Sequence, residues 1–226
     1  MNKRRADGAK ALLAVLLVVG WTASAHLASS GIGPADLHTV VAVAPLLVAA
    51  LTILWQTPLR GAAGWCVMLG LAGLLAWHWT WLRGNLPWLY YLQHLGSHMA
   101  LAAWFGRSLL AGREPVVTGM ARMIFGDGLS ERKRRYTRQV TRAWTAFFIV
   151  NALVSTLLFA FAPTELWSWH ANVLTGPLIA LVFLVEALVR RCVLPPEERP
   201  GVAEVMQAWR ARQHQERDIT AGPTHP

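Results

Sequence analysis

Histidines are the residues of this sequence whose type and spacing best suit chemistry. Six of the eight lie in or beside long apolar stretches, namely His26, His38, His78, His94, His98 and His170. His94 and His98 are four residues apart, so on a helix they share one face. With His78 on the preceding antiparallel helix, this pair could ligate a metal or a haem iron. The sequence therefore offers one candidate metal site.

The residues around these histidines favour a plainer interpretation. No glutamate stands between His94 and His98, and the carboxylate-supported histidine clusters of membrane di-iron enzymes are absent. Interhelical hydrogen bonds or a position at the membrane interface are the expected explanation for these histidines. Asn151 and Ser155 are expected to bond across helices, and we expect no cofactor. Because the chain also lacks a glycine-rich phosphate loop and a nucleophile elbow, the protein is expected to be non-catalytic. A membrane-bound metal or haem enzyme stays open as an alternative.

Composition identifies the helices that must position these side chains. Hydrophobic residues make up 54% of the 226 and charged residues only 15%, against roughly 25% charged in soluble domains. Apolar runs of about 18 to 22 residues match a ~30 Å hydrocarbon core, where the backbone must be helical. We therefore predict an all-α polytopic membrane protein with about six spans: Lys10–Ala28, Leu37–Trp55, Gly61–Leu82, Leu86–Phe105, Ala143–Ala162 and Ala171–Val189.

Basic residues predict the orientation of these spans. With a cytoplasmic N-terminus, all but one of the 21 Lys and Arg residues fall on the cytoplasmic side, and the exception is Arg83. This bias predicts a bacterial inner-membrane protein with both termini in the cytoplasm. It also explains the net charge of +9 without nucleic acid. The predicted parts are residues 1–106 with four spans, a basic loop at 107–142, two spans at 143–189, and a cytoplasmic tail at 190–226.

The N-terminus allows a second interpretation. Three basic residues, an apolar stretch and Ala23-Ser24-Ala25 together imitate a secretory signal with a small-residue cleavage site. The apolar stretch continues past Gly20, long enough to span a bilayer, so an uncleaved first span is the leading interpretation. Cleavage would leave the other five helices in the same orientation.

The loop at 107–142 is the largest predicted cytoplasmic surface between spans. Ser130 is a plausible N-cap for a helix that leads into the fifth span. Its candidate partner-binding residues are Arg132, Lys133, Arg134, Arg135, Arg138 and Arg142. These cations predict attraction to the anionic inner leaflet, and they also suit an acidic protein partner or a phosphate-bearing substrate. An apolar segment at 116–125 and a tail helix near 202–217 are predicted to lie at the membrane surface.

The second half of the chain resembles a known family. The resemblance rests on LAAWFGRSLLAGREPVVTGMAR, on RRYTRQVTRAWTAFFIVNALVSTLLFAFAPTELWSWHANVL, and on the LVEALVRR that closes the last span. These strings, within Leu101 to Arg191, are similar to uncharacterised small bacterial membrane proteins whose genes accompany aryl-polyene (xanthomonadin-type) pigment biosynthesis. The resemblance implies an inner-membrane accessory that works beside an acyl carrier protein and membrane acyltransferases.

Members of that family are sometimes labelled ketosynthase, which the residues here do not support. A condensing enzyme needs an activated cysteine with histidine partners. Cys66 lies within a predicted span and Cys192 at a membrane boundary, and neither has a histidine nearby in sequence. The expected function is recruitment of soluble synthesis components. Two alternatives stay open: a transporter or flippase for a lipid-like product, and the membrane-bound enzyme described above.

Overall fold

The structure is a computed structural model that describes residues 16, 19–28, 32–56, 61–126 and 128–199. Throughout these ranges the regular structure is helical and contains no β-strand, which confirms the all-α prediction. Residues 19–28 form a helix. The elements that follow are α2 (Ala35–Gln56), α3 (Ala62–Trp77), α4 (Trp79–Gly84), α5 (Leu86–Ser108), α6 (Val116–Phe125), α7 (Glu131–Phe161), α8 (Thr164–Ser168), the π-helix η1 (Trp169–Leu174), α9 (Thr175–Val193) and a 3₁₀ turn η2 (Pro196–Glu198).

Three described helices are long and apolar enough to cross a membrane. They are Ala35–Thr52 within α2, the whole of α7, and the continuous run Thr164–Val193 that joins α8, η1 and α9. The helix α5 has 23 residues but is not among them, because its polar residues, including Gln93, His94 and His98, lower its hydropathy. Most of the first predicted span and the predicted tail helix lie outside the described residues.

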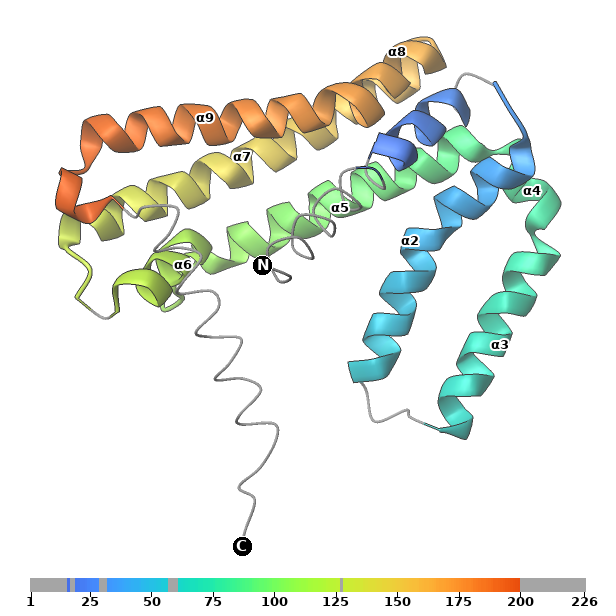
Figure 1. Cartoon of the computed structure of the whole chain (residues 1–226), viewed down its shortest axis with the longest axis horizontal. Coiled ribbons are helices and arrows are strands. Elements are labelled where there is room, and N and C mark those ends of the chain that lie inside the picture. Colours follow the sequence, from blue (N-terminus) through green and yellow to red (C-terminus); the bar gives the residue numbers. More distant parts are fainter. Residues whose placement is uncertain (1–15, 17–18, 29–31, 57–60, 127, 200–226) are drawn as a thin grey trace, which may run out of the picture. The chain divides into compact units, whose positions relative to one another are not determined.

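The third predicted span differs from the structure. It was expected to be one helix over Gly61–Leu82, but α3 ends at Trp77 and the short α4 begins at Trp79 (Figure 1). His78 stands at the break with φ −93° and ψ 9°, outside the α-helical region. The 16 residues of α3 extend only about 24 Å at 1.5 Å per residue. This helix alone is therefore shorter than a ~30 Å hydrocarbon core.

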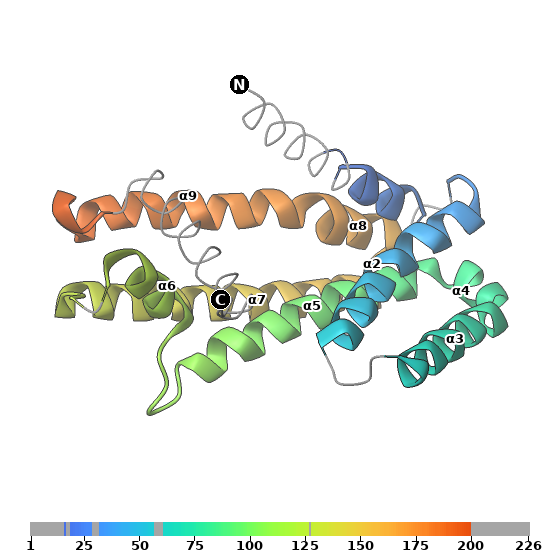
Figure 2. The ribbon, with the colours of Figure 1, turned by 60° about the horizontal axis from the view of Figure 1, so that its bottom comes forward.

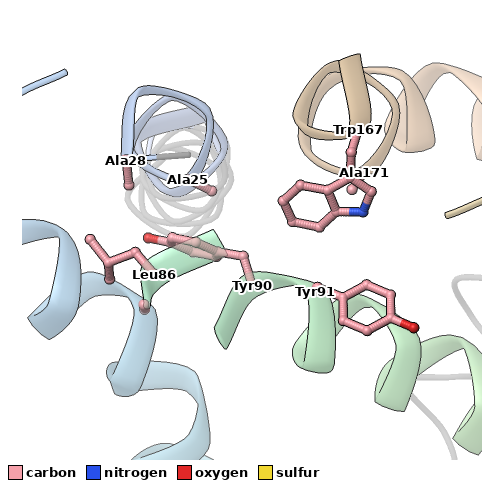
Figure 3. Packing of buried hydrophobic residues seen from close by; sticks show 8 residues of the cluster. Ala25, Ala28, Leu86, Tyr90, Tyr91, Trp167 and Ala171 are labelled. Carbon is pink, nitrogen blue, oxygen red and sulfur yellow. The ribbon is translucent and has the colours of Figure 1, made fainter. Parts of the chain in front are cut away.

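The chain divides into two compact units. Three helices, α5, α7 and α9, each contribute residues to both units. Unit 1 comprises Met1–Ser97 and Ala152–Pro177, and unit 2 comprises His98–Asn151 and Leu178–Pro226. The core of unit 1 joins the helix at 19–28, α2, the start of α5 and the α8–η1 run, as Figure 3 shows. Its buried members are Ala25, Ala28, Ala42, Leu86, Tyr90, Tyr91, Trp167 and Ala171. Small alanines opposite large aromatic rings allow these helices to approach closely.

The core of unit 2 has α7 at its centre. Its buried members are Ala102, Phe105, Tyr136, Val140, Trp144, Phe148 and Leu194. The short helix α6 lies beside the first turns of α7 (Figure 2), where the hydroxyls of Thr118 and Thr137 are 2.7 Å apart and buried. Gly126, with φ 67°, ends α6 in a conformation that favours glycine. This contact places an amphipathic helix directly against the first turns of α7.

Candidate functional site: the basic segment of α7

Residues 131–142 of α7, called here the basic segment, form an ordered extension of the fifth predicted span. The Lys133 backbone N–H donates to the Ser130 hydroxyl at 3.1 Å, which confirms Ser130 as the N-cap. No glycine or proline interrupts the 31 residues of α7. The basic segment therefore continues the helix of the fifth predicted span without a break.

The six predicted partner-binding residues do not share one face. Arg132, Arg134, Arg135 and Arg142 are exposed, and Arg138 is half-buried. Lys133, by contrast, is only 4% exposed. The helical repeat explains this difference, since Lys133 shares its face with the buried Thr137 and Val140. Lys133 consequently belongs to the packed interior of unit 2 rather than to its exposed surface.

Backbone carbonyls orient two of the arginines. The Arg134 guanidinium donates through Nε to the Leu129 carbonyl at 3.3 Å. That of Arg138 donates through Nη2 to the Leu109 carbonyl at 2.9 Å. Since Leu109 precedes α6, the second bond ties the basic segment to the chain that leads out of α5.

A basic hollow of about 360 Å³ lies beside these arginines. Its lining residues are Arg113, Glu114, Pro115, Thr118, Glu131, Arg134, Arg135 and Arg138. Four arginines thus stand against two glutamates, which leaves an excess of positive charge. Glu114 also pairs with Arg122 at 2.7 Å, in an exposed ion pair that contributes little stability. The hollow and the exposed arginines beside it form a surface suited to anionic groups.

A polar cluster lies on the inward side of the same segment. The Tyr136 hydroxyl lies 3.0 Å from Oε1 of Glu186 and 3.1 Å from the Glu186 carbonyl. Glu186 also pairs with Arg190, four residues further along α9, at 3.5 Å. The Tyr136 hydroxyl is thus a hydrogen-bond donor that joins α7 to α9.

Four of the six histidines hydrogen-bond to polar side chains on other helices, as predicted, and they are His26, His38, His94 and His98. Within unit 2, the Asn151 amide nitrogen lies 2.7 Å from Nε2 of His98. Within unit 1, His94 bonds to Thr175 at 3.1 Å and His26 to Ser168 at 2.9 Å. His78 is exposed at the break between α3 and α4. Among the described residues no three His, Cys, Asp or Glu side chains form a group that could hold a metal, so His78, His94 and His98 form no such group.

The π-helix η1 has no counterpart in the sequence prediction. It contains the buried His170 and Asn172. Hydrogen bonds with nearby residues stabilise its π-helical geometry. The Thr175 hydroxyl donates to the His170 carbonyl at 2.9 Å, and the Asn172 amide donates to Ser168 Oγ at 3.0 Å. Single-turn π-helices often mark functional positions, and here the segment carries two buried polar residues beside Ala171 of the unit 1 core.

Comparison with known proteins gives no information on function, so the basic segment is the main evidence for it. The chain matches no family model, no curated protein and no solved structure. Sequence reasoning located the exposed arginines but missed the burial of Lys133 and the contact between Tyr136 and Glu186. The seven-residue spacing of Lys133, Val140 and Phe147 is the signal that could have placed Lys133 on the inward face.

Proposed function

We propose that this protein is an accessory of the bacterial inner membrane that recruits an acidic soluble partner to the basic segment of α7. In this proposal both termini are cytoplasmic and six helices cross the bilayer. The partner that the family resemblance suggests is an acyl carrier protein of aryl-polyene synthesis, which would meet membrane acyltransferases there. The observation that carries the proposal is the set of exposed arginines beside the basic hollow, held on a helix that continues into a span.

The surface of the apolar helices supports the membrane part of the proposal. No residue of α9 is buried, although leucine, valine and phenylalanine dominate its sequence. Large side chains such as Trp65, Leu69 and Phe161 are also strongly exposed. Soluble monomers rarely expose contiguous apolar surface of this extent, whereas lipid covers it at no cost.

Reporter fusions test the six-span topology. Fusions after Gly84 and after Pro163 are expected to report the periplasm, and fusions after Gly112 and after Pro200 the cytoplasm. The physical reason is the one-sided distribution of Lys and Arg. Alkaline phosphatase and green fluorescent protein fusions, active on opposite sides, measure this directly. A cytoplasmic signal after Pro163 would contradict the six-span topology.

Charge removal on the basic segment tests recruitment. We expect Arg132→Gln combined with Arg135→Gln to weaken binding of the acyl carrier protein about tenfold at 0.1 M salt, equal to about 1.4 kcal/mol. The difference should vanish near 1 M salt, where the Debye length falls from ~10 Å to about 3 Å. Binding to the purified protein in lipid nanodiscs is measured by biolayer interferometry. Aryl-polyene content of lipid extracts gives the cellular readout.

The matched control is Arg107→Gln combined with Arg191→Gln. Both residues are exposed and predicted to be cytoplasmic, and both lie outside the basic segment and the basic hollow. The control therefore removes the same charge from the same side of the membrane. If it weakens carrier binding as much as the first variant, only net charge matters and the proposed docking surface is wrong. Unchanged binding in the first variant also rejects it.

A further inference from the structure

A groove of about 460 Å³ lies at the end of α5, entirely within unit 2. Its volume is in the usual range of clefts for small ligands, about 300–1,000 Å³. On α5 the wall consists of Ala100, Ala103, Trp104 and Arg107, and beyond α5 it consists mainly of Arg113 and Glu114. The four residues of α5 share one face, because they recur at intervals of three and four residues. That face is exposed along its whole length.

Hydrogen bonds fold the chain after α5 back onto the end of this helix. The Ser108 hydroxyl donates to the Phe105 carbonyl at 2.6 Å and accepts the backbone N–H of Val116 at 3.1 Å. The loop that carries Arg113 is therefore closed at both ends. Its return places Arg113 in the same groove as Arg107.

The polar end of the groove is cationic. Arg107 and Arg113 are exposed, and neither side chain has a hydrogen-bond or ion-pair partner among the described residues. The carboxylate of Glu114 is already paired with Arg122 at 2.7 Å. The indole of Trp104 is exposed, and its Nε1 likewise has no acceptor in the part of the chain that the structure describes. Two guanidinium groups and one indole N–H are thus available to a phosphate, a partner that arginine binds well.

The order of these residues along α5 matches the order of chemical groups in a phospholipid. In the proposed topology the fourth span ends at Phe105, so Ala100 and Ala103 lie at the depth of the acyl chains. Their small side chains leave room for a hydrocarbon chain beside the helix. Trp104 lies at the interface, where indole rings prefer to lie. Arg107 lies about 3 Å beyond the span at 1.5 Å per residue, within a headgroup layer roughly 5–7 Å thick.

We propose that this groove binds an anionic phospholipid of the inner leaflet. Its phosphate would lie between Arg107, Arg113 and the indole N–H of Trp104, with one acyl chain along Ala100 and Ala103. The proposal goes beyond recruitment, since it gives the protein a lipid ligand of its own. It rests only on the topology given under the proposed function, which the reporter fused after Gly112 tests separately.

Native mass spectrometry tests the proposal by counting the lipids that the protein retains. The full-length protein is delipidated in detergent and titrated with phosphatidylglycerol or with phosphatidylcholine of the same acyl chains. One phosphatidylglycerol should bind about ten times more tightly than the first phosphatidylcholine, because only phosphatidylglycerol carries a net negative charge. Equal affinities would overturn the proposal. Glycerol 3-phosphate in large excess should not displace the lipid, since it lacks acyl chains. Displacement would show that the site takes a soluble phosphate ester and would overturn the proposal as well.

Two variants, each with a matched control, locate the lipid. Arg107→Gln should weaken phosphatidylglycerol binding about fivefold, the usual effect of one basic residue near an anionic headgroup. Its control, Arg191→Gln, removes one exposed charge outside the groove and should have no effect. Ala103→Leu fills the apolar part of the groove without changing its charge and should weaken binding about tenfold. Its control, Ala143→Leu, makes the same substitution at an exposed position of α7. Wild-type affinity in Arg107→Gln or in Ala103→Leu, or an equal loss in the controls, would refute the site.

Carrier binding, measured on the same samples, separates this proposal from the docking surface. Ala103 and Arg107 lie outside the basic segment and the basic hollow, so neither variant should change carrier binding. A loss of lipid with normal carrier binding supports a separate lipid site. A joint loss would mean that the two surfaces are one and would overturn the proposal. Failure of the wild-type protein to bind the carrier would reject recruitment and leave the lipid result intact.

Discussion

Replacing Trp167 by alanine is expected to lower the free energy of unfolding by about 3–5 kcal/mol, the usual cost of removing a large buried aromatic side chain. Trp167 is 0% exposed and is the largest fully buried side chain of the described residues. Its ring lies 5.1 Å from that of Phe159 and 6.3 Å from that of Tyr91, measured between centroids. Its Nε1 donates to Ser155 Oγ at 3.0 Å. The substitution thus removes the centre of the unit 1 core (Figure 3).

Two variants separate packing from the hydrogen bond and from simple loss of tryptophan. Trp167→Phe keeps most of the ring and removes the donor, so its cost should be smaller, about 1–3 kcal/mol for the buried acceptor and the lost volume. Trp77→Ala removes a tryptophan that is 85% exposed and should cost little. Unfolding of the detergent-solubilised protein in a denaturant series measures all three. Equal effects of Trp167→Ala and Trp77→Ala would contradict the described core.

Hydrophobic length and caps were sufficient to predict most helices. The apolar run before Gln56 predicted α2 to within two residues at each end. The run after the basic segment predicted only the C-terminal part of α7, and the N-cap at Ser130 predicted where that helix begins. Ser130 was predicted as an N-cap from residue type alone, because its hydroxyl can accept a bond from the first turn. Proline at 163 likewise marked the boundary between α7 and α8. These features are local, so the sequence contains all the information that they require.

Packing partners could not be predicted in the same way. Lys133 was grouped with its charged neighbours, because charge predicts exposure. Its burial depends on α6 lying against α7, with Phe125 over the ammonium group. No local pattern specifies that contact, since it joins residues on different helices. The burial of Lys133 therefore became visible only in three dimensions.

The helix interruptions escaped prediction for a related reason. Nothing in the residues of η1 requires a π-helix, and its geometry depends on the Thr175 hydroxyl that reaches the His170 carbonyl. The break at His78 is similar, since histidine is no strong helix breaker. Beyond the break, Trp79 donates to Asp36 at 2.9 Å, and Arg83 pairs with the same carboxylate at 3.0 Å. These contacts of α4 with α2 favour the break, and they too join distant residues.

The buried pair of His98 and Asn151 gives the second large stability effect. Each of the two single substitutions, His98→Leu and Asn151→Leu, should cost about 1–3 kcal/mol, because the remaining polar group is left buried without this bond. The double variant should cost less than the sum, since replacing both partners by apolar groups leaves neither group unsatisfied. The coupling is expected to be about 1 kcal/mol, within the range measured for hydrogen bonds between membrane helices.

A double-mutant cycle measures that coupling, again by unfolding in detergent. A matched cycle uses the exposed Met99 and Val150, each adjacent in sequence to one member of the pair, which are replaced by alanine singly and together. Their costs should simply add, because each side chain points away from the contact between α5 and α7. Additive costs for His98 and Asn151 would mean that the two side chains do not bond in the folded protein. A coupling confined to the buried pair would instead show that these two helices are held in register by a hydrogen bond, and that His98 is a structural residue of unit 2 rather than a metal ligand.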